Sequence, residues 1–253
     1  MQASRVGQTL AVNNIELFYE TRGEGQPLLL LHGFGGLGRD WELVFKETPA
    51  GYRLIAPDLR GHGRSTNPAR TFTFRQAALD VLALLDLLGI ERFKAIGLSG
   101  GAKTLLHVAT QQPARVEAAV LVSGGHYFPN QARKLMAQMT VESHTEQEWE
   151  FMRSRHPRGD DQIRLLWEQC HAFKDSYDDM NFTAPFLSTI TARTLIVYGD
   201  RDPVYPVEMA LEMYRAIPNS CLWVIPNGGH GPVFGEMGQR FVETAIPFLG
   251  GTP

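Results

Sequence analysis

The chain has 253 residues, of which 43% are apolar and 20% charged, and its formal net charge is -3. These values favour a globular protein with one large α/β domain or two small ones, and they give no electrostatic basis for binding nucleic acid or an anionic membrane. We expect no membrane span, no signal peptide and, with only Cys170 and Cys221, no disulfide framework, which together favour a cytoplasmic protein.

Short apolar runs recur along the chain. Residues 9–23 form two β-rich runs that are broken by Asn13 and Asn14, a pattern that predicts a hairpin. Six later runs are continuously apolar rather than alternating, as is typical of strands that are buried on both faces of a parallel sheet. These runs cover residues 27–33, 53–59, 92–98, 116–124, 193–200 and 221–226.

Helical patterns separate several of these runs. They cover residues 72–89, 101–113, 206–218 and 238–250. The alternation predicts an α/β fold with a doubly wound, mostly parallel sheet of about eight strands and right-handed crossovers.

The stretch from residue 126 to residue 190 breaks this rhythm. It lacks a convincing buried strand and is rich in Met, Gln, Glu, His and aromatic residues, which predicts several helices. An insertion of roughly 65 residues far exceeds an ordinary loop, and long insertions are often active-site lids. We therefore expect a core in residues 1–125 and 191–253, with a helical cap in residues 126–190 inserted between core strands 6 and 7.

Two serines begin the tripeptide Ser-Gly-Gly, and their neighbours distinguish them. Ser99 lies between Gly97 and Gly101 in a Gly-x-Ser-x-Gly pattern that joins a predicted strand to a predicted helix. Small neighbours allow the sharp turn that raises a serine hydroxyl above the sheet edge. Ser99 is therefore the candidate nucleophile, with a helix N-cap as its alternative role. Ser123 has Leu121 two residues before it, where Ser99 has a glycine, so the Gly-x-Ser-x-Gly pattern is absent. We therefore expect Ser123 to be a strand-end or turn serine.

A serine nucleophile needs a general base and a carboxylate that orients this base. Asp200 and Asp202 follow one predicted strand, and His230 follows the last one, so the carboxyl ends of parallel strands would bring them to one edge. Periodicity does not separate the two aspartates. His32 is interpreted as structural, and His62 and His126, beside predicted strand ends, could line the pocket. The other histidines of the insertion are expected on solvated faces: His144, His156 and His171.

An oxyanion hole requires two N–H donors. Gly100, directly after the candidate nucleophile, supplies one, and Phe34, after the strand that begins at residue 27, is the candidate for the other. Lys103 lies one helical turn after Ser99 and is expected to be an exposed helix residue, with a role in tuning the polarity near the site as its alternative.

These motifs together resemble the α/β-hydrolase fold family in the same order along the chain. The resemblance implies that the acid is the aspartate three residues after Gly199, which is Asp202, with Asp200 as the second candidate. It also implies that Asp58, His62 and Arg64 shape a loop beside the site, and that Gly100, where relatives often carry a larger side chain, widens the acyl site. The matching segments are residues 29–36, 54–65, 97–101, 195–206 and 227–231.

The resemblance implies a serine hydrolase that cleaves small to medium carboxylic esters through an acyl-enzyme. Ser99 argues against the dehalogenase and epoxide hydrolase branches, which use aspartate at this position. A carbon–carbon bond hydrolase, a lactonase, a cofactor-free perhydrolase and a non-catalytic ligand receptor remain alternatives. Without metal-ligand spacing or a Gly-x-Gly-x-x-Gly motif, we expect no cofactor. Four aromatic residues of the insertion are expected in the substrate pocket or in the cap core: Trp149, Phe151, Trp167 and Phe173.

Overall fold

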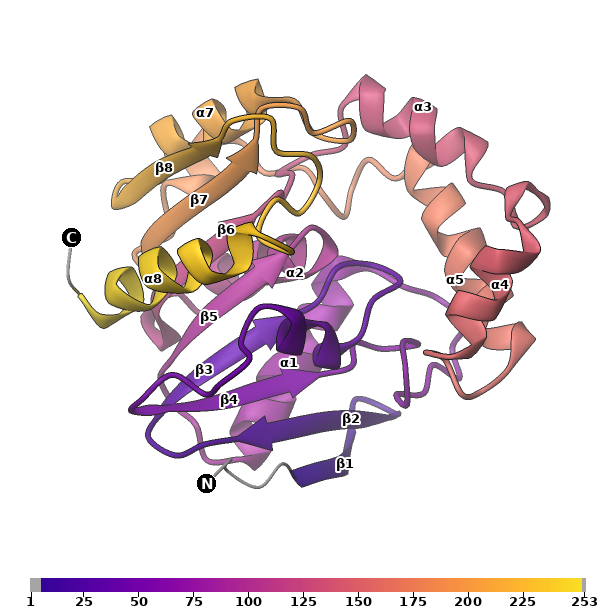
Figure 1. Ribbon diagram of the computed structural model, residues 1–253, viewed down its shortest axis with the longest axis horizontal. Coiled ribbons are helices and arrows are strands. Elements are labelled where there is room, and N and C mark those ends of the chain that lie inside the picture. The colour runs from indigo at the N-terminus through magenta and orange to yellow at the C-terminus, as the bar shows by residue number, and fades with distance from the viewer. Residues whose placement is uncertain (1–5, 252–253) are drawn as a thin grey trace.

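Eight strands form one twisted sheet in the computed structural model, which describes residues 6–251 (Figure 1). Their spatial order is β1-β2-β4-β3-β5-β6-β7-β8, in which β1, β2 and β4 pair antiparallel and all other neighbours pair parallel. The predicted doubly wound, mostly parallel sheet is thus confirmed. The strands are β1 (Val6–Val12), β2 (Ile15–Arg22), β3 (Gln26–Leu31), β4 (Tyr52–Pro57), β5 (Phe93–Leu98), β6 (Val116–Val122), β7 (Arg193–Gly199) and β8 (Ser220–Ile225).

The N-terminal hairpin forms one edge of the sheet. Asn13 and Asn14 connect its strands with φ values of 43° and 64°, the left-handed conformations that a tight two-residue hairpin turn requires. Asparagine tolerates this conformation better than most residues do, which explains why the sequence signal for the turn was clear.

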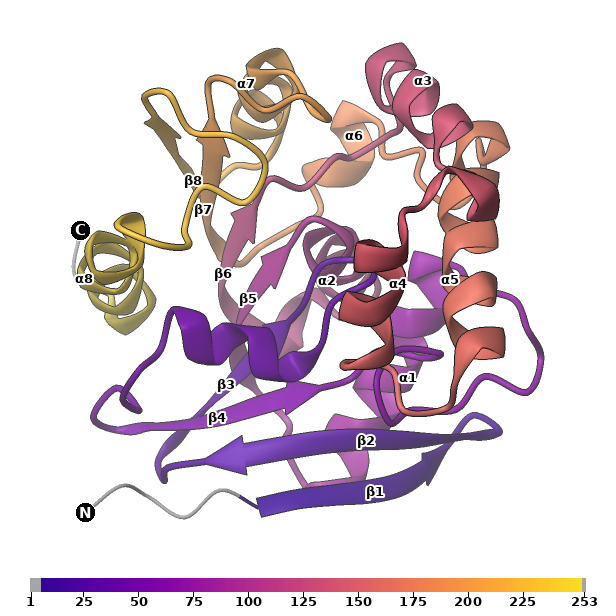
Figure 2. The same ribbon diagram turned by 45° about the vertical axis from the view of Figure 1, so that its right-hand side comes forward.

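Helices cover both faces of the sheet (Figure 2). Successive strand residues point to opposite faces, so Leu29 and Leu31 pack toward one helical layer while Leu28 and Leu30 pack toward the other. Continuous apolar runs follow from this burial on two sides. The first layer contains α1 (Phe74–Leu87), α2 (Gly100–Gln111) and α7 (Val207–Ala216), and the second contains the 3-10 helix η1 (Gly38–Leu43) and α8 (Met237–Gly250).

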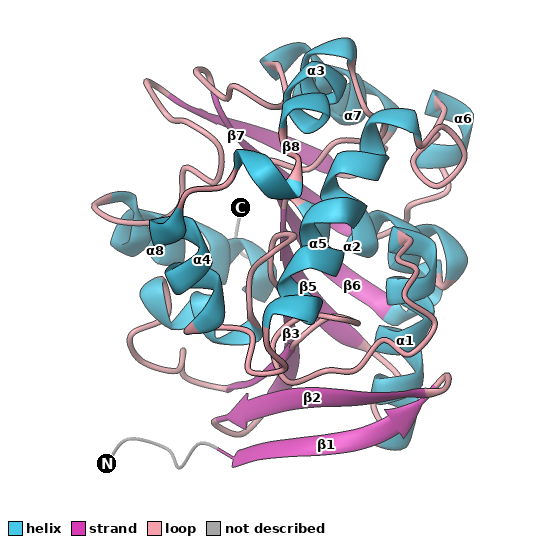
Figure 3. Ribbon diagram, turned by 90° about the vertical axis from the view of Figure 1, so that its right-hand side faces the viewer, coloured by secondary structure: helices cyan, strands magenta, loops and turns pink. Residues whose placement is uncertain are grey.

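Further helices lie in the chain between β6 and β7. Figure 3 views the molecule from the side on which α3, α4 and α5 gather, beyond the carboxyl ends of the strands. A helical cap with the bounds 126–190 remains a prediction. Its elements are α3 (Asn130–Gln138), η3 (Val141–Ser143), α4 (Glu146–Arg153), α5 (Asp160–Ala172), η4 (Phe173–Asp175) and α6 (Ala184–Leu187).

Hydrogen bonds attach this inserted segment to the rest of the fold. The Asp179 carboxylate accepts hydrogen bonds from the N–H groups of Phe74 and Arg75 at the start of α1, over 2.6 and 3.1 Å. The Gln162 side chain donates to the carbonyl oxygens of Gly61 and Gly63. The segment is therefore held against core loops at more than one point.

His156 was expected on a solvated face, and this expectation was wrong. Its side chain is buried, and its Nδ1 accepts a hydrogen bond of 2.9 Å from the N–H of Gly63. Burial is the main cause that lowers the pKa of His156 to about 4, so the ring is neutral near pH 7. The packing of the inserted segment onto a distant core loop produces this burial.

No helix within residues 6–251 is both long and apolar enough to cross a membrane.

Candidate active site

Ser99 occupies a sharp turn between β5 and α2. Its φ of 48° lies in the left-handed region that few non-glycine residues adopt. A Cβ atom at Gly97 would lie 2.6 Å from the carbonyl oxygen of Gly101, and one at Gly101 would lie 2.2 Å from that of Leu31. The turn therefore requires glycine at both flanking positions of the Gly-x-Ser-x-Gly pattern.

Ser99, His230 and Asp202 form a continuous chain of hydrogen bonds. His230 Nε2 lies 2.9 Å from Ser99 Oγ, and His230 Nδ1 lies 2.9 Å from Asp202 Oδ2. Because the ionised Asp202 carboxylate accepts a hydrogen bond from Nδ1–H, the unprotonated Nε2 faces the serine hydroxyl. The structure thus brings together three residues that are separated by up to 131 positions in the sequence.

The Asp202 side chain is fully buried, whereas 29% of the His230 side chain is exposed. Burial by itself raises the pKa of Asp202. Hydrogen bonds from His230 and from the backbone N–H groups of Tyr205 and Val204 outweigh this effect, and the pKa is lowered. The carboxylate is therefore ionised near neutral pH and suited to orient an imidazole.

Asp200, the other aspartate after β7, has surroundings that differ from those of Asp202. It is exposed, and its carboxylate lies 4.0 Å from the guanidinium of Arg201. Its backbone N–H donates a hydrogen bond of 3.3 Å to the carbonyl oxygen of Ile225, the last residue of β8. Of the two aspartates that periodicity did not separate, Asp202 is the one whose carboxylate contacts His230.

Phe34 and Gly100 lie against each other beside Ser99. A Cβ atom at Gly100 would lie 2.8 Å from the backbone nitrogen of Phe34. Gly100 is the first residue of α2, where N–H groups have no partner inside the helix. Within residues 6–251, the Phe34 N–H makes no backbone hydrogen bond. Both donors are thus available at the turn, and a side chain at position 100 would press on one of them.

Ser123 has a different role from Ser99. It too has a left-handed φ, of 47°, but it is fully buried. Its Oγ accepts a hydrogen bond of 3.1 Å from the N–H of Gly231, next to His230. Ser123 therefore supports the loop that carries the histidine, a contact across 108 residues that sequence reasoning missed.

A cavity of about 350 Å³ adjoins Ser99 and His230. Its aromatic wall comes from both the core and the inserted segment, and the rings of Phe34 and Phe173 pack edge to face with centroids 4.9 Å apart. Of the four aromatic residues expected near the site, only Phe173 lines this cavity. Trp149 and Trp167 pack against each other with their ring centroids 4.4 Å apart, and Phe151 is exposed. The other lining residues are Phe74, Gly100, Lys103, Phe128, Ala132, Leu135, Met136, Gln138, Met139, Cys170, Val204 and Tyr205.

Lys103 was expected to be exposed, and this expectation was wrong. Only 2% of the residue is exposed, and it lines the cavity together with Ser99. α2 packs against α1 and the sheet, and residues of the inserted segment contact it as well: Phe128 contacts Lys103, and Asp179 contacts His107. Residues 100–109 of α2 are therefore all buried.

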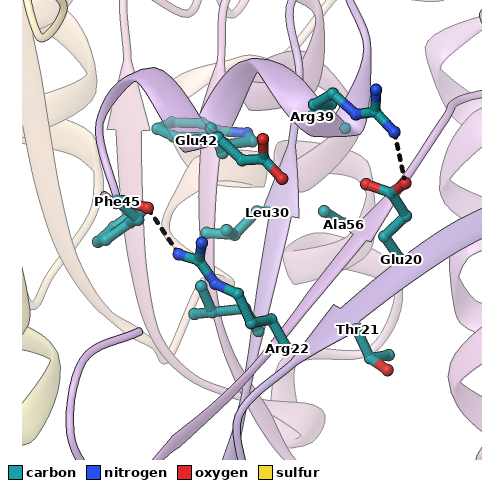
Figure 4. A pocket seen from close by; sticks show the side chains of 11 residues that line it. Glu20, Thr21, Arg22, Leu30, Arg39, Glu42, Phe45 and Ala56 are labelled. Atoms are coloured by element: carbon teal, nitrogen blue, oxygen red, sulfur yellow. Dashed lines mark hydrogen bonds and ion pairs between the residues drawn. The ribbon is translucent and has the colours of Figure 1, made fainter. Parts of the chain in front are cut away.

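A second, much smaller cavity lies between η1 and the strands β2 and β4 (Figure 4). Its volume of about 30 Å³ suits a water molecule rather than an organic substrate. Arg22 donates to the carbonyl oxygen of Phe45, and Arg39 pairs with Glu20. This small cavity shares no lining residue with the cavity at Ser99, so it is not a candidate active site.

The part of the chain that is described contains no group of three or more His, Cys, Asp or Glu residues that could hold a metal ion.

Comparisons with known proteins agree with this fold. A model described as the alpha/beta hydrolase family matches residues 28–244. A non-heme chloroperoxidase of Burkholderia pyrrocinia is 30% identical, with 87% of this chain and 91% of that protein covered. A 2-hydroxy-6-oxononadienedioate/2-hydroxy-6-oxononatrienedioate hydrolase of Pseudomonas putida is 28% identical over 93% of this chain and 92% of its own. The structure of a thermophilic esterase from Thermogutta terrifontis superposes with a TM-score of 0.76, at 26% identity, and covers 98% of this chain and 99% of that chain.

Proposed function

Because this chain belongs to the alpha/beta hydrolase family, we propose that it is a carboxylesterase that cleaves small to medium esters through an acyl-enzyme intermediate. The observation that carries this proposal is the unbroken series of hydrogen bonds from Asp202 through His230 to Ser99, placed at the wall of a largely apolar cavity. In this proposal Ser99 is the nucleophile, His230 the general base, and Asp202 the residue that orients the base.

Acylation begins when His230 Nε2 takes the proton of the Ser99 hydroxyl while Oγ attacks the ester carbonyl carbon. The negative charge that develops on the carbonyl oxygen is stabilised by the N–H groups of Phe34 and Gly100. The tetrahedral intermediate collapses, the bond to the alcohol oxygen breaks, and His230 delivers its proton to the leaving alcohol. The acyl group is then bonded to Ser99 Oγ.

Deacylation repeats these steps with water. His230 takes a proton from a water molecule, and the oxygen attacks the acyl carbonyl carbon within the same oxyanion hole. Collapse of the second intermediate breaks the bond to Ser99 Oγ, which recovers its proton from His230. The products are a carboxylic acid and the free enzyme, so no cofactor is needed.

The cavity supports a substrate of modest size. Its volume of about 350 Å³ is near the lower end of typical small-molecule sites. Phe34, Phe128 and Phe173 supply apolar surface for an acyl chain. Peptides and large polar substrates fit this lining poorly.

Turnover of a p-nitrophenyl ester series of increasing acyl length tests the proposal. Ser99→Ala is expected to lower kcat by at least about 10³-fold, because the nucleophile is lost. Ser188→Ala, a change at an exposed serine in the inserted segment, serves as the matched control. A fluorophosphonate adduct on Ser99 supports the proposal, whereas equal turnover by wild type and Ser99→Ala refutes it. Tight ligand binding with negligible turnover would favour a receptor instead.

A carbon–carbon bond hydrolase that uses the same three residues is the second candidate. The relative from Pseudomonas putida, named as a hydrolase of 2-hydroxy-6-oxononadienedioate, supports this alternative. An assay with a vinylogous diketone beside the ester series separates the two: faster cleavage of the diketone than of every ester would replace the esterase proposal.

A further inference from the structure

The proposed mechanism leaves one charged group at the site without a role. Lys103 lies on α2 one helical turn after Ser99, is 2% exposed, and lines the cavity that Ser99 and His230 also line. Lysines are almost never fully buried unless their charge is paired, because burying an unpaired ammonium in an apolar site costs free energy.

Three aromatic rings surround the Lys103 ammonium. Its Nζ lies 4.3 Å from the ring centroid of Tyr205 and 5.4 Å from those of Phe74 and Phe128. These contacts favour a cation, but each is weaker than a hydrogen-bonded ion pair. Within residues 6–251, the structure gives this side chain no hydrogen bond and no ion pair.

The nearby carboxylates are already engaged. Asp202 accepts hydrogen bonds from His230 and from two backbone N–H groups, and Asp179 accepts from the two N–H groups that begin α1. Cys170, which also lines the cavity, has its pKa raised to about 11, chiefly by burial, and so carries no charge near pH 7. No group of the cavity is therefore free to serve as a counterion for Lys103.

The charge state of the lysine reflects this arrangement. Burial lowers the pKa of Lys103 to about 7, against the opposing influence of Asp202, Cys170 and Asp179. An anion that entered the cavity would favour the charged amine. Apart from Gln138 and the groups around Ser99, the remaining lining is mainly apolar and aromatic, so Lys103 is the lining residue that offers a cationic amine to such an anion.

We propose that Lys103 binds a free carboxylate carried by the substrate, so that the preferred esters are monoesters of short dicarboxylic acids. This inference rests on the proposed function, because it takes the cavity beside Ser99 as the acyl site. In it, the ester carbonyl lies at Ser99 while the far end of the acyl chain meets the ammonium. One helical turn, a rise of about 5.4 Å, separates the two backbone positions, so a short acyl chain suffices to span them.

A matched pair of substrates tests the proposal directly. Monoethyl adipate and the ethyl ester of adipamic acid differ only in a carboxylate that is replaced by a neutral carboxamide. We expect wild type to prefer the carboxylate by at least about 10-fold in kcat/KM, which is the scale of a charge-assisted contact. Lys103→Met is expected to remove this preference, whereas Lys134→Met, a change at an exposed lysine of α3, is expected to keep it. An equal preference in wild type and Lys103→Met overturns the proposal.

Binding to the Ser99→Ala protein separates this inference from the hydrolase proposal. Titration calorimetry with monoethyl adipate and with the carboxamide ester measures the binding affinity for each ester in the absence of turnover. A preference for the carboxylate that is lost when Lys103→Met is added supports the inference, even if no ester is hydrolysed by wild type. If wild type hydrolyses neutral esters but the Ser99→Ala protein binds both probes equally, the inference fails while the proposed function stands.

Discussion

Replacing Lys103 by methionine gives the sharpest prediction about stability. Methionine keeps an unbranched chain of similar length and fills the same space, but it removes the amine that burial disfavours. We expect the variant to be more stable than wild type at neutral and acidic pH, which is unusual for a change at a buried position. Such a gain would mean that the lysine is kept for function at the expense of stability.

The magnitude follows from the shift in pKa. The lysine has a pKa of about 7 in the folded protein, against 10.5 as the ordinary value. Between these values the unfolded chain holds a proton that the folded protein lacks, so the stability of wild type rises with pH across this window. Below pH 7, the full shift corresponds to about 5 kcal/mol of destabilisation by Lys103. This penalty declines by about 1.4 kcal/mol per pH unit above pH 7 and vanishes near pH 10.5.

Urea unfolding of wild type and Lys103→Met between pH 6 and pH 10 measures this effect. The difference between their free energies of unfolding cancels the titration of most other groups, because both proteins contain them. Lys46→Met, a change at an exposed lysine, provides the control and is expected to show no such pH dependence. A gain in stability that does not change between pH 6 and pH 10 would refute the reasoning, because Lys103 would then bind the same number of protons in both states.

Three further substitutions test the geometry of the site. Asp202→Asn is expected to lower kcat by about 10³- to 10⁴-fold, because the imidazole loses the carboxylate that selects its tautomer, whereas Asp200→Asn is expected to leave kcat near the wild-type value. Gly100→Ala places a Cβ atom 2.8 Å from the backbone nitrogen of Phe34, which belongs to the proposed oxyanion hole, so we expect kcat to fall roughly 10- to 100-fold with the fold retained, as circular dichroism would verify. Gly101→Ala places a Cβ atom 2.2 Å from a carbonyl oxygen of β3 and is expected to lower the free energy of unfolding by at least about 2 kcal/mol. Gly250→Ala, with its nearest atom 4.0 Å away, is the control for both glycine variants, and an equal response of all three would contradict these expectations.

The elements that position the site are predictable from local sequence. A buried parallel strand needs a continuous apolar run, and the turn at Ser99 needs small residues on both sides, so both leave a signal within a few positions. The Asn13–Asn14 turn is predictable for the same reason. The doubly wound sheet and the candidate nucleophile could therefore be predicted before any contact was known.

The partners of Ser99 were only partly predictable. The carboxyl ends of parallel strands meet at one edge, which predicts that His230 and an aspartate approach the serine. Asp200 and Asp202 follow the same strand, however, and only the direction of each side chain decides which carboxylate meets the imidazole. The resemblance to a known family favoured Asp202, and the 2.9 Å contact with His230 gives that choice its geometry.

Burial of Lys103 and His156 was decided by tertiary structure alone. In the sequence, a lysine on a helix and a histidine among polar residues read as solvated, because the local pattern carries no information about what covers them. The inserted segment folds back over the start of α2 and over the loop that contains Gly63, and so removes both side chains from water. The sequence by itself determined which backbone conformations the chain adopts, since these depend on near neighbours. The contacts between distant segments determined the electrostatic character of the cavity, since desolvation depends on everything packed around a charge.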